Sequence, residues 1–146
     1  MQSKSVVFRI ASIIMMVAGI IGVVSNFLGA IVFNIAGNSD VVQAANVLSG
    51  SKINFGLLWF ATILGIIASV VEIVAGVMGK NNCTDSSKAQ TFMYMGVGIA
   101  AVALIANILT IVAVSSFSFS SFLSIASGIA VPVFYTVAAL QLKNQG

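Results

Sequence analysis

Long apolar runs separated by short polar segments make up most of this chain. Four of the runs are long enough to span a membrane as helices, because a hydrocarbon core about 30 Å thick needs about 20 mostly apolar residues. Charged residues, or clusters of glycine, asparagine and serine, bound each run, and such clusters interrupt regular structure. The pattern predicts four membrane-spanning helices, over residues 10–35, 53–78, 91–114 and 122–142.

Small and polar residues within each run recur at alternating spacings of three and four, which places them in one stripe along each helix. In lipid, helices meet through small residues that allow close approach and polar residues that form hydrogen bonds. A repeat of about 3.5 residues is typical of left-handed supercoiling. The glycines expected at these helix contacts are Gly19, Gly22, Gly65, Gly76, Gly79, Gly96 and Gly128.

The connections between the runs favour a simple topology. Residues 80–90 and 115–121 form short connections, which favour antiparallel neighbours. We therefore expect a single all-α transmembrane domain, an up-down-up-down four-helix bundle over residues 1–146. In the longer connection, residues 40–48 are compatible with a short interfacial helix that Ser39 would cap.

The basic residues indicate the orientation of the bundle. Cytoplasmic loops carry an excess of Lys and Arg. Only Lys52 lies on one side of the predicted spans, and the opposite side carries five basic residues: Lys4, Arg9, Lys80, Lys88 and Lys143. We expect a multi-pass protein of the cell membrane with both termini in the cytoplasm. The first run exceeds the roughly 7–15 apolar residues of a signal peptide, so we interpret it as a retained span.

The composition excludes several classes of protein. Charged residues are 6% of the chain, against roughly 25% in soluble domains. A soluble enzyme, a disordered tail and a nucleic-acid-binding module are therefore excluded. The chain has no His and a single cysteine, Cys83, expected to be a reduced thiol. These residues cannot build a zinc site, a disulfide framework or a Ser-His-Asp triad, so we expect neither catalysis nor a cofactor.

Glu72 is the only ionisable side chain well inside a predicted span. A carboxylate facing lipid is costly, so we expect Glu72 to point into the bundle and either pair or take up a proton. Its estimated depth favours a hydrogen bond to Tyr135, or to a backbone carbonyl near Pro132, where the helix should bend because proline lacks an N–H. Both an ion or proton site and a structural role in helix packing are compatible with this pattern.

Asn26 and Asn107 lie at similar estimated depths in the first and third runs. The two amides are therefore candidates for a mutual or water-bridged hydrogen bond between helices. The alternative is that they line a pore.

The whole chain resembles small four-span membrane proteins of Gram-positive bacteria that have no assigned activity. The resemblance rests on two segments, Glu-Ile-Val-Ala-Gly at 72–76 and Pro-Val-Phe-Tyr at 132–135, each followed by a segment containing Lys and Asn. It implies a bacterial membrane protein and supplies no catalytic residue. The layout is also similar to that of claudins and tetraspanins, but their cysteine-bearing outer loops are missing here.

Three functions remain open from the sequence. The first and favoured one is a structural or accessory component that packs with itself or with another membrane protein. The second is a small channel or transporter subunit that uses Glu72, Asn26 and Asn107. The third, a membrane enzyme acting on lipid, is the least favoured because acid, base and metal ligands are lacking. In each case the lipid bilayer is the immediate partner, and no nucleic acid is expected.

Overall fold

The computed structural model describes residues 2–37, 53–115 and 117–144. These residues form four long helices and one short 3₁₀ helix, and the described part of the chain contains no strand. The elements are α1 (Gln2–Gly37), α3 (Phe55–Asn81), η1 (Ser86–Lys88), α4 (Ala89–Val114) and α5 (Phe119–Lys143). The helix considered for residues 40–48 lies outside the described residues.

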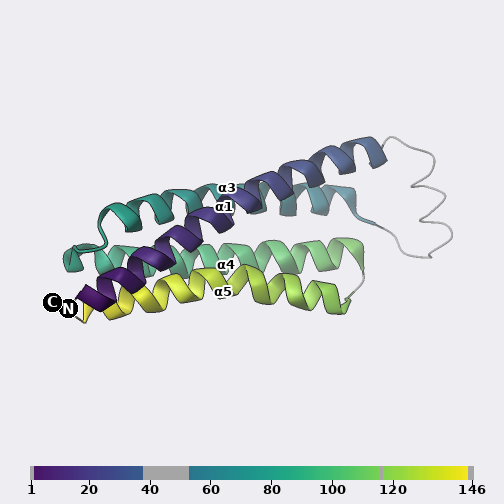
Figure 1. The fold of residues 1–146 in the computed structure, drawn as a ribbon. Coiled ribbons are helices and arrows are strands. Elements are labelled where there is room, and N and C mark those ends of the chain that lie inside the picture. The colour runs from purple at the N-terminus through teal and green to yellow at the C-terminus, as the bar shows by residue number, and fades with distance from the viewer. Residues whose placement is uncertain (1, 38–52, 116, 145–146) are drawn as a thin grey trace.

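The four long helices form a bundle in which consecutive helices run in opposite directions (Figure 1). α1 packs against α3 and α5, and α4 packs against the same two helices. Both chain termini and the turn between α3 and α4 lie at one end of the bundle, here called the termini end (Figure 1). The opposite end is called the far end. The prediction of an all-α, up-down-up-down four-helix bundle is confirmed.

Each long helix is long and apolar enough to cross a membrane. Large apolar side chains on the outer faces of the bundle are exposed, including Phe27, Ile67 and Ile105. Such faces would be unfavourable in water and are suited to contact with acyl chains. The four helices therefore fit a multi-pass membrane protein.

Local side-chain chemistry sets two of the helix starts. The Asn54 side chain accepts a hydrogen bond from the Leu57 amide at 3.1 Å, so α3 begins at Phe55. Ser118 and Ser121 form a capping box that starts α5 at Phe119.

The helix α1 begins eight residues before the predicted span. In its first turns Lys4 and Arg9 are exposed and Phe8 is fully buried.

The turn between α3 and α4 carries the one ion pair found among the described residues. Asp85 caps η1 by accepting a hydrogen bond from the Ser87 amide at 3.1 Å, and Lys88 lies 3.7 Å away. The Ser87 hydroxyl, with its amide and the Lys88 charge, holds the pKa of Asp85 below its usual range. This polar turn marks the termini end as a water-facing surface.

Tight packing of aromatic rings fills the half of the bundle next to the termini end. Phe8, Phe92 and Tyr135, from α1, α4 and α5, are fully buried, and their ring centroids lie 5.2 to 6.4 Å apart. The Tyr135 hydroxyl donates a hydrogen bond to the Ala75 carbonyl of α3 at 2.9 Å. All four helices are therefore joined at this level.

Glycines bring the helix backbones together around this core. A Cβ on Gly76 would lie 2.7 Å from both the Met16 nitrogen and the Ser12 carbonyl oxygen, which are backbone atoms of α1. A Cβ on Gly79 would lie 2.8 Å from the Tyr135 hydroxyl, and one on Gly96 would lie 3.2 Å from the Tyr135 ring. Glycines on α3 and α4 thus make room for the α1 backbone and the Tyr135 ring.

The substitution Gly76→Ala tests this close packing. The new methyl group would push against backbone atoms that cannot rotate away, so we expect a loss of about 1–3 kcal/mol in the free energy of unfolding. The measurement is reversible unfolding of the purified protein in detergent micelles, followed by circular dichroism.

The matched control is Gly98→Ala, because a Cβ at this position of α4 meets no atom within 4 Å. This variant should be as stable as the parent protein or slightly more stable, since alanine favours a helix more than glycine does. Equal destabilisation by the two substitutions would contradict the proposed packing.

Candidate functional site: a polar cavity

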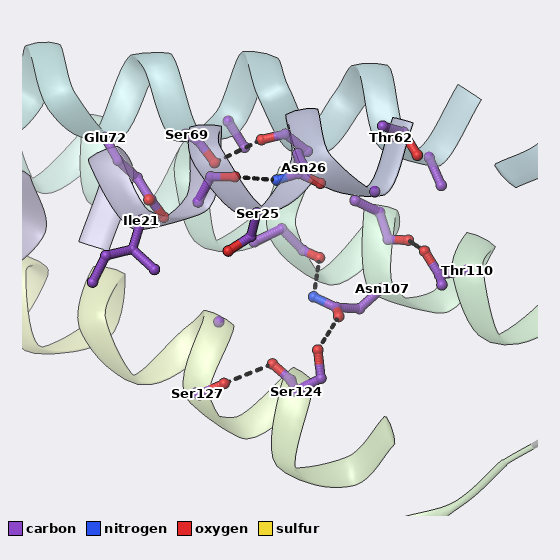
Figure 2. Close-up of a pocket in the computed structure, with 18 of the residues that line it drawn as sticks. Ile21, Ser25, Asn26, Thr62, Ser69, Glu72, Asn107, Thr110, Ser124 and Ser127 are labelled. Carbon is purple, nitrogen blue, oxygen red and sulfur yellow. Dashed lines mark hydrogen bonds between the residues drawn. The ribbon is translucent and has the colours of Figure 1, made fainter. Parts of the chain in front are cut away.

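The half of the bundle next to the far end contains a cavity of about 680 Å³. All four long helices contribute to its wall, through residues of the segments 18–29, 58–72, 103–110 and 124–131 (Figure 2). Apolar wall residues include Ile21, Leu58 and Val131. Small residues at many of the other positions leave this space open, in contrast to the aromatic core beside it.

Polar side chains are concentrated on this cavity (Figure 2). The polar residues of its wall are Ser25, Asn26, Thr62, Ser69, Glu72, Asn107, Thr110, Ser124 and Ser127. They come from all four helices and lie in the apolar part of each span. The polar stripes of the separate helices therefore meet in one place.

Most of these polar side chains hydrogen-bond to their own helix. Asn26 and Asn107 each donate to the carbonyl four residues earlier at 2.8 Å. Thr62 and Ser69 do the same at 2.8 Å, and Thr110 at 2.9 Å. These bonds satisfy the hydroxyl hydrogens and one N–H of each amide without joining neighbouring helices. Apart from a bond between Ser124 of α5 and Asn107 of α4, the polar wall therefore contributes little to holding the bundle together.

Asn26 and Asn107 line the same cavity, but the structure shows no hydrogen bond between them. The Asn107 carbonyl oxygen instead accepts a bond from the Ser124 hydroxyl of α5 at 3.1 Å. The expected direct bond between the two amides is therefore wrong. Their common position on the wall leaves room for a bridging water or ligand.

Glu72 is half-buried and lines the cavity at the end nearest the aromatic core (Figure 2). Within residues 2–37, 53–115 and 117–144, no cation pairs with Glu72 and no hydrogen bond reaches its carboxylate. The same residues contain no group of three or more His, Cys, Asp or Glu side chains that could hold a metal ion. The site thus offers one carboxylate at one end of a wall whose other polar side chains are neutral.

Tyr135 does not take part in this site. We expected it to hydrogen-bond to Glu72, but its hydroxyl donates to the Ala75 carbonyl, inside the aromatic core. Ala75 lies almost one turn beyond Glu72 on α3, so the depth estimated from the sequence was close and the bonding partner was wrong. Tyr135 bonds to Ala75 because Gly79 and Gly96 leave space for its ring in the aromatic core, away from the cavity.

Pro132 is buried within α5, which continues through it to Lys143. Because Pro132 has no N–H, it cannot donate to the carbonyl of Gly128, which lies on the cavity wall.

The other glycines in this region are tightly packed between α1 and α3. A Cβ on Gly65 would lie 2.7 Å from the Asn26 side chain, one on Gly19 would lie 2.7 Å from the Ser69 carbonyl oxygen, and one on Gly22 would meet the Ser69 hydroxyl.

Six polar wall residues were absent from the sequence-based site: Ser25, Thr62, Ser69, Thr110, Ser124 and Ser127. Of these, Ser25 and Ser127 lie beside the stripe residues Asn26 and Gly128, so the polar face is wider in this part of α1 and α5. Two adjacent small or polar residues in a span, instead of one, were the sequence feature from which Ser25 and Ser127 could have been predicted. A wider polar face indicates a surface exposed to a cavity, whereas a single stripe is enough for helix packing.

Comparisons with protein-family models, curated proteins and solved structures give no match for this chain.

A labelling experiment tests whether water reaches the cavity. In a Cys83→Ser background, Ser25→Cys should react with a charged methanethiosulfonate reagent, because a thiolate forms only where water is present. The control is Val24→Cys, since Val24 is exposed on the outer face of α1 and would face lipid. We expect labelling at position 25 to be at least about tenfold faster. Equal rates would show that the cavity is no wetter than the lipid-facing surface.

Proposed function

We propose that this chain is a small channel or transporter subunit whose solute binds in the cavity of the far half. The observation that supports this proposal is the position of Glu72. It is the one carboxylate well inside a span, it lines the cavity, and none of the described side chains neutralises it. Acidic residues within membrane spans commonly mark pathways for ions or protons.

The hydrogen bonds of the wall favour this role over one in helix packing. If the polar residues served to join helices, they should bond from one helix to another. Asn26, Thr62 and Ser69 bond instead to their own helices, and Glu72 bonds to none of the described residues. The bond from Ser124 to Asn107 does join two helices. Most of the helix contact is supplied by the aromatic core and by glycines, which include Gly22 and Gly65 beside the cavity. We therefore infer that the polar wall serves a solute.

We also propose an orientation and a location for the bundle. All five basic residues in the described part of the chain belong to the termini end. Under the positive-inside rule, this end lies in the cytoplasm and the cavity lies in the outer half of the bilayer. The resemblance to four-span proteins of Gram-positive bacteria would place the chain in a bacterial cell membrane. We propose no catalytic activity.

Solute flux through proteoliposomes tests the proposed function. Vesicles containing the protein should dissipate an imposed gradient of K⁺, protons or methylammonium faster than empty vesicles do. Glu72→Gln should reduce this flux by at least about tenfold, because it removes the charge while keeping the shape of the side chain. Asp85→Asn is the matched control, since Asp85 is exposed in the turn between α3 and α4.

The proposal would be wrong if folded parent protein gives no flux of any of these solutes. It would also be wrong if Glu72→Gln and the parent protein give the same flux.

A structural or accessory component is the second candidate function, and Gly98 favours it. This glycine lies on the outer face of α4, where a Cβ would meet no atom within 4 Å. A small residue that faces lipid allows close approach of another helix. Such a contact would join this chain to a second copy or to another membrane protein.

Cross-linking in membranes tests the accessory role. Gly98→Leu should reduce self-association, or co-purification of a membrane protein, by at least about fivefold, because the larger side chain blocks close approach. Gly56→Leu is the control, since Gly56 is exposed at the first turn of α3. Unchanged association in Gly98→Leu would count against this second function.

A further inference from the structure

Three hydroxyl groups of the cavity wall present acceptors to a solute. A hydroxyl group has a single hydrogen and two lone pairs. The hydroxyls of Thr62, Ser69 and Thr110 each donate that hydrogen to a carbonyl of their own helix, at 2.8 to 2.9 Å. Their oxygens can therefore only accept a hydrogen bond from a solute, whereas Asn26 and Asn107 each keep one N–H. At the three hydroxyls, a solute with hydrogen-bond donors is better suited than one with acceptors.

The charge of the cavity favours a positively charged solute. Glu72 supplies one negative charge when ionised, and no Lys or Arg is among the wall residues. The described basic residues belong to the termini end, beyond the aromatic core. Attraction between opposite charges strengthens away from water, so this site favours a single positive charge.

The size and composition of the wall favour an organic cation over a metal ion. A volume of about 680 Å³ lies within the range of small-molecule pockets, about 300–1,000 Å³. Ile21, Leu58 and Val131 give the wall an apolar part that can cover hydrocarbon. Divalent metal ions generally need about six or more oxygen ligands in a compact shell, with carboxylates among them. One carboxylate in a wide cavity does not form such a shell.

We propose that the cavity binds a monovalent organic ammonium ion that carries N–H donors. Its nitrogen lies at the Glu72 carboxylate and the Ser69 hydroxyl oxygen, and its hydrocarbon part lies against the apolar wall. This inference rests on the proposed function and names the chemical class of the solute.

Calorimetry on the full-length protein in phosphatidylcholine nanodiscs tests this assignment. Phenethylammonium is the probe, and phenylacetate is a matched anion of similar size. We expect phenethylammonium to bind and phenylacetate to bind at least about tenfold more weakly. Glu72→Gln should weaken phenethylammonium binding by at least about tenfold, and Asp85→Asn should leave it unchanged.

A second comparison tests the acceptors. The N,N,N-trimethyl analogue of phenethylammonium has the same charge but no N–H donors. Ser69→Ala removes the wall hydroxyl that lies about one helical turn from Glu72, so it should weaken phenethylammonium several-fold more than the trimethyl analogue. Ser12→Ala is the control, because Ser12 forms the same kind of bond within α1 but does not line the cavity.

Three results would overturn the assignment: no binding of phenethylammonium, equal affinity for phenylacetate, or unchanged affinity in Glu72→Gln. If phenethylammonium fails to bind while Glu72-dependent flux of K⁺ or protons persists, the assignment is wrong and the proposed function stands. If binding and flux are both absent, the assignment and the proposed function are both wrong.

Discussion

Close contact between helix backbones at the termini end is the constraint on which the rest of the structure depends. Lipid does not drive apolar helices together, so their association needs close packing or hydrogen bonds between them. Gly76 lets α3 approach the backbone of α1, and Gly79 and Gly96 accommodate the Tyr135 ring. With this end closed, the other half of the bundle can contain a cavity without losing the fold. Side chains thus fill the half with the aromatic core, whereas the half with the cavity is held by the close contact of α1 with α3 at Gly19 and Gly22.

This division explains why the polar residues of the span serve two different purposes. Tyr135 lies in the closed half, and its hydroxyl bonds to a carbonyl of a neighbouring helix. Asn26, Ser69 and Thr110 lie in the hollow half, and their donors return to their own helices. A donor bonded within its own helix is satisfied wherever the neighbouring helices lie. The hollow half therefore tolerates a cavity at little cost in unsatisfied polar groups.

The fold could be predicted from the sequence because apolar runs of this length have few alternatives in a membrane. The position of Glu72 on the inner face followed from the cost of placing a carboxylate in lipid. The partner of Tyr135 did not follow, because every residue has a backbone carbonyl and only packing decides which one lies within reach. The cavity did not follow either. A stripe of small residues predicts that helices meet, but the extent of each contact depends on how the helices diverge along their length.

The helix α1 is held at two levels of the bundle. Its first turns join the aromatic core through Phe8, and beyond Phe8 it continues for about 40 Å toward the far end. Along this stretch Gly19 and Gly22 keep it against Ser69 of α3. α1 therefore cannot swing away from α3 without breaking these contacts, and any change in the width of the cavity would have to move α1 and α3 together, relative to α4 and α5.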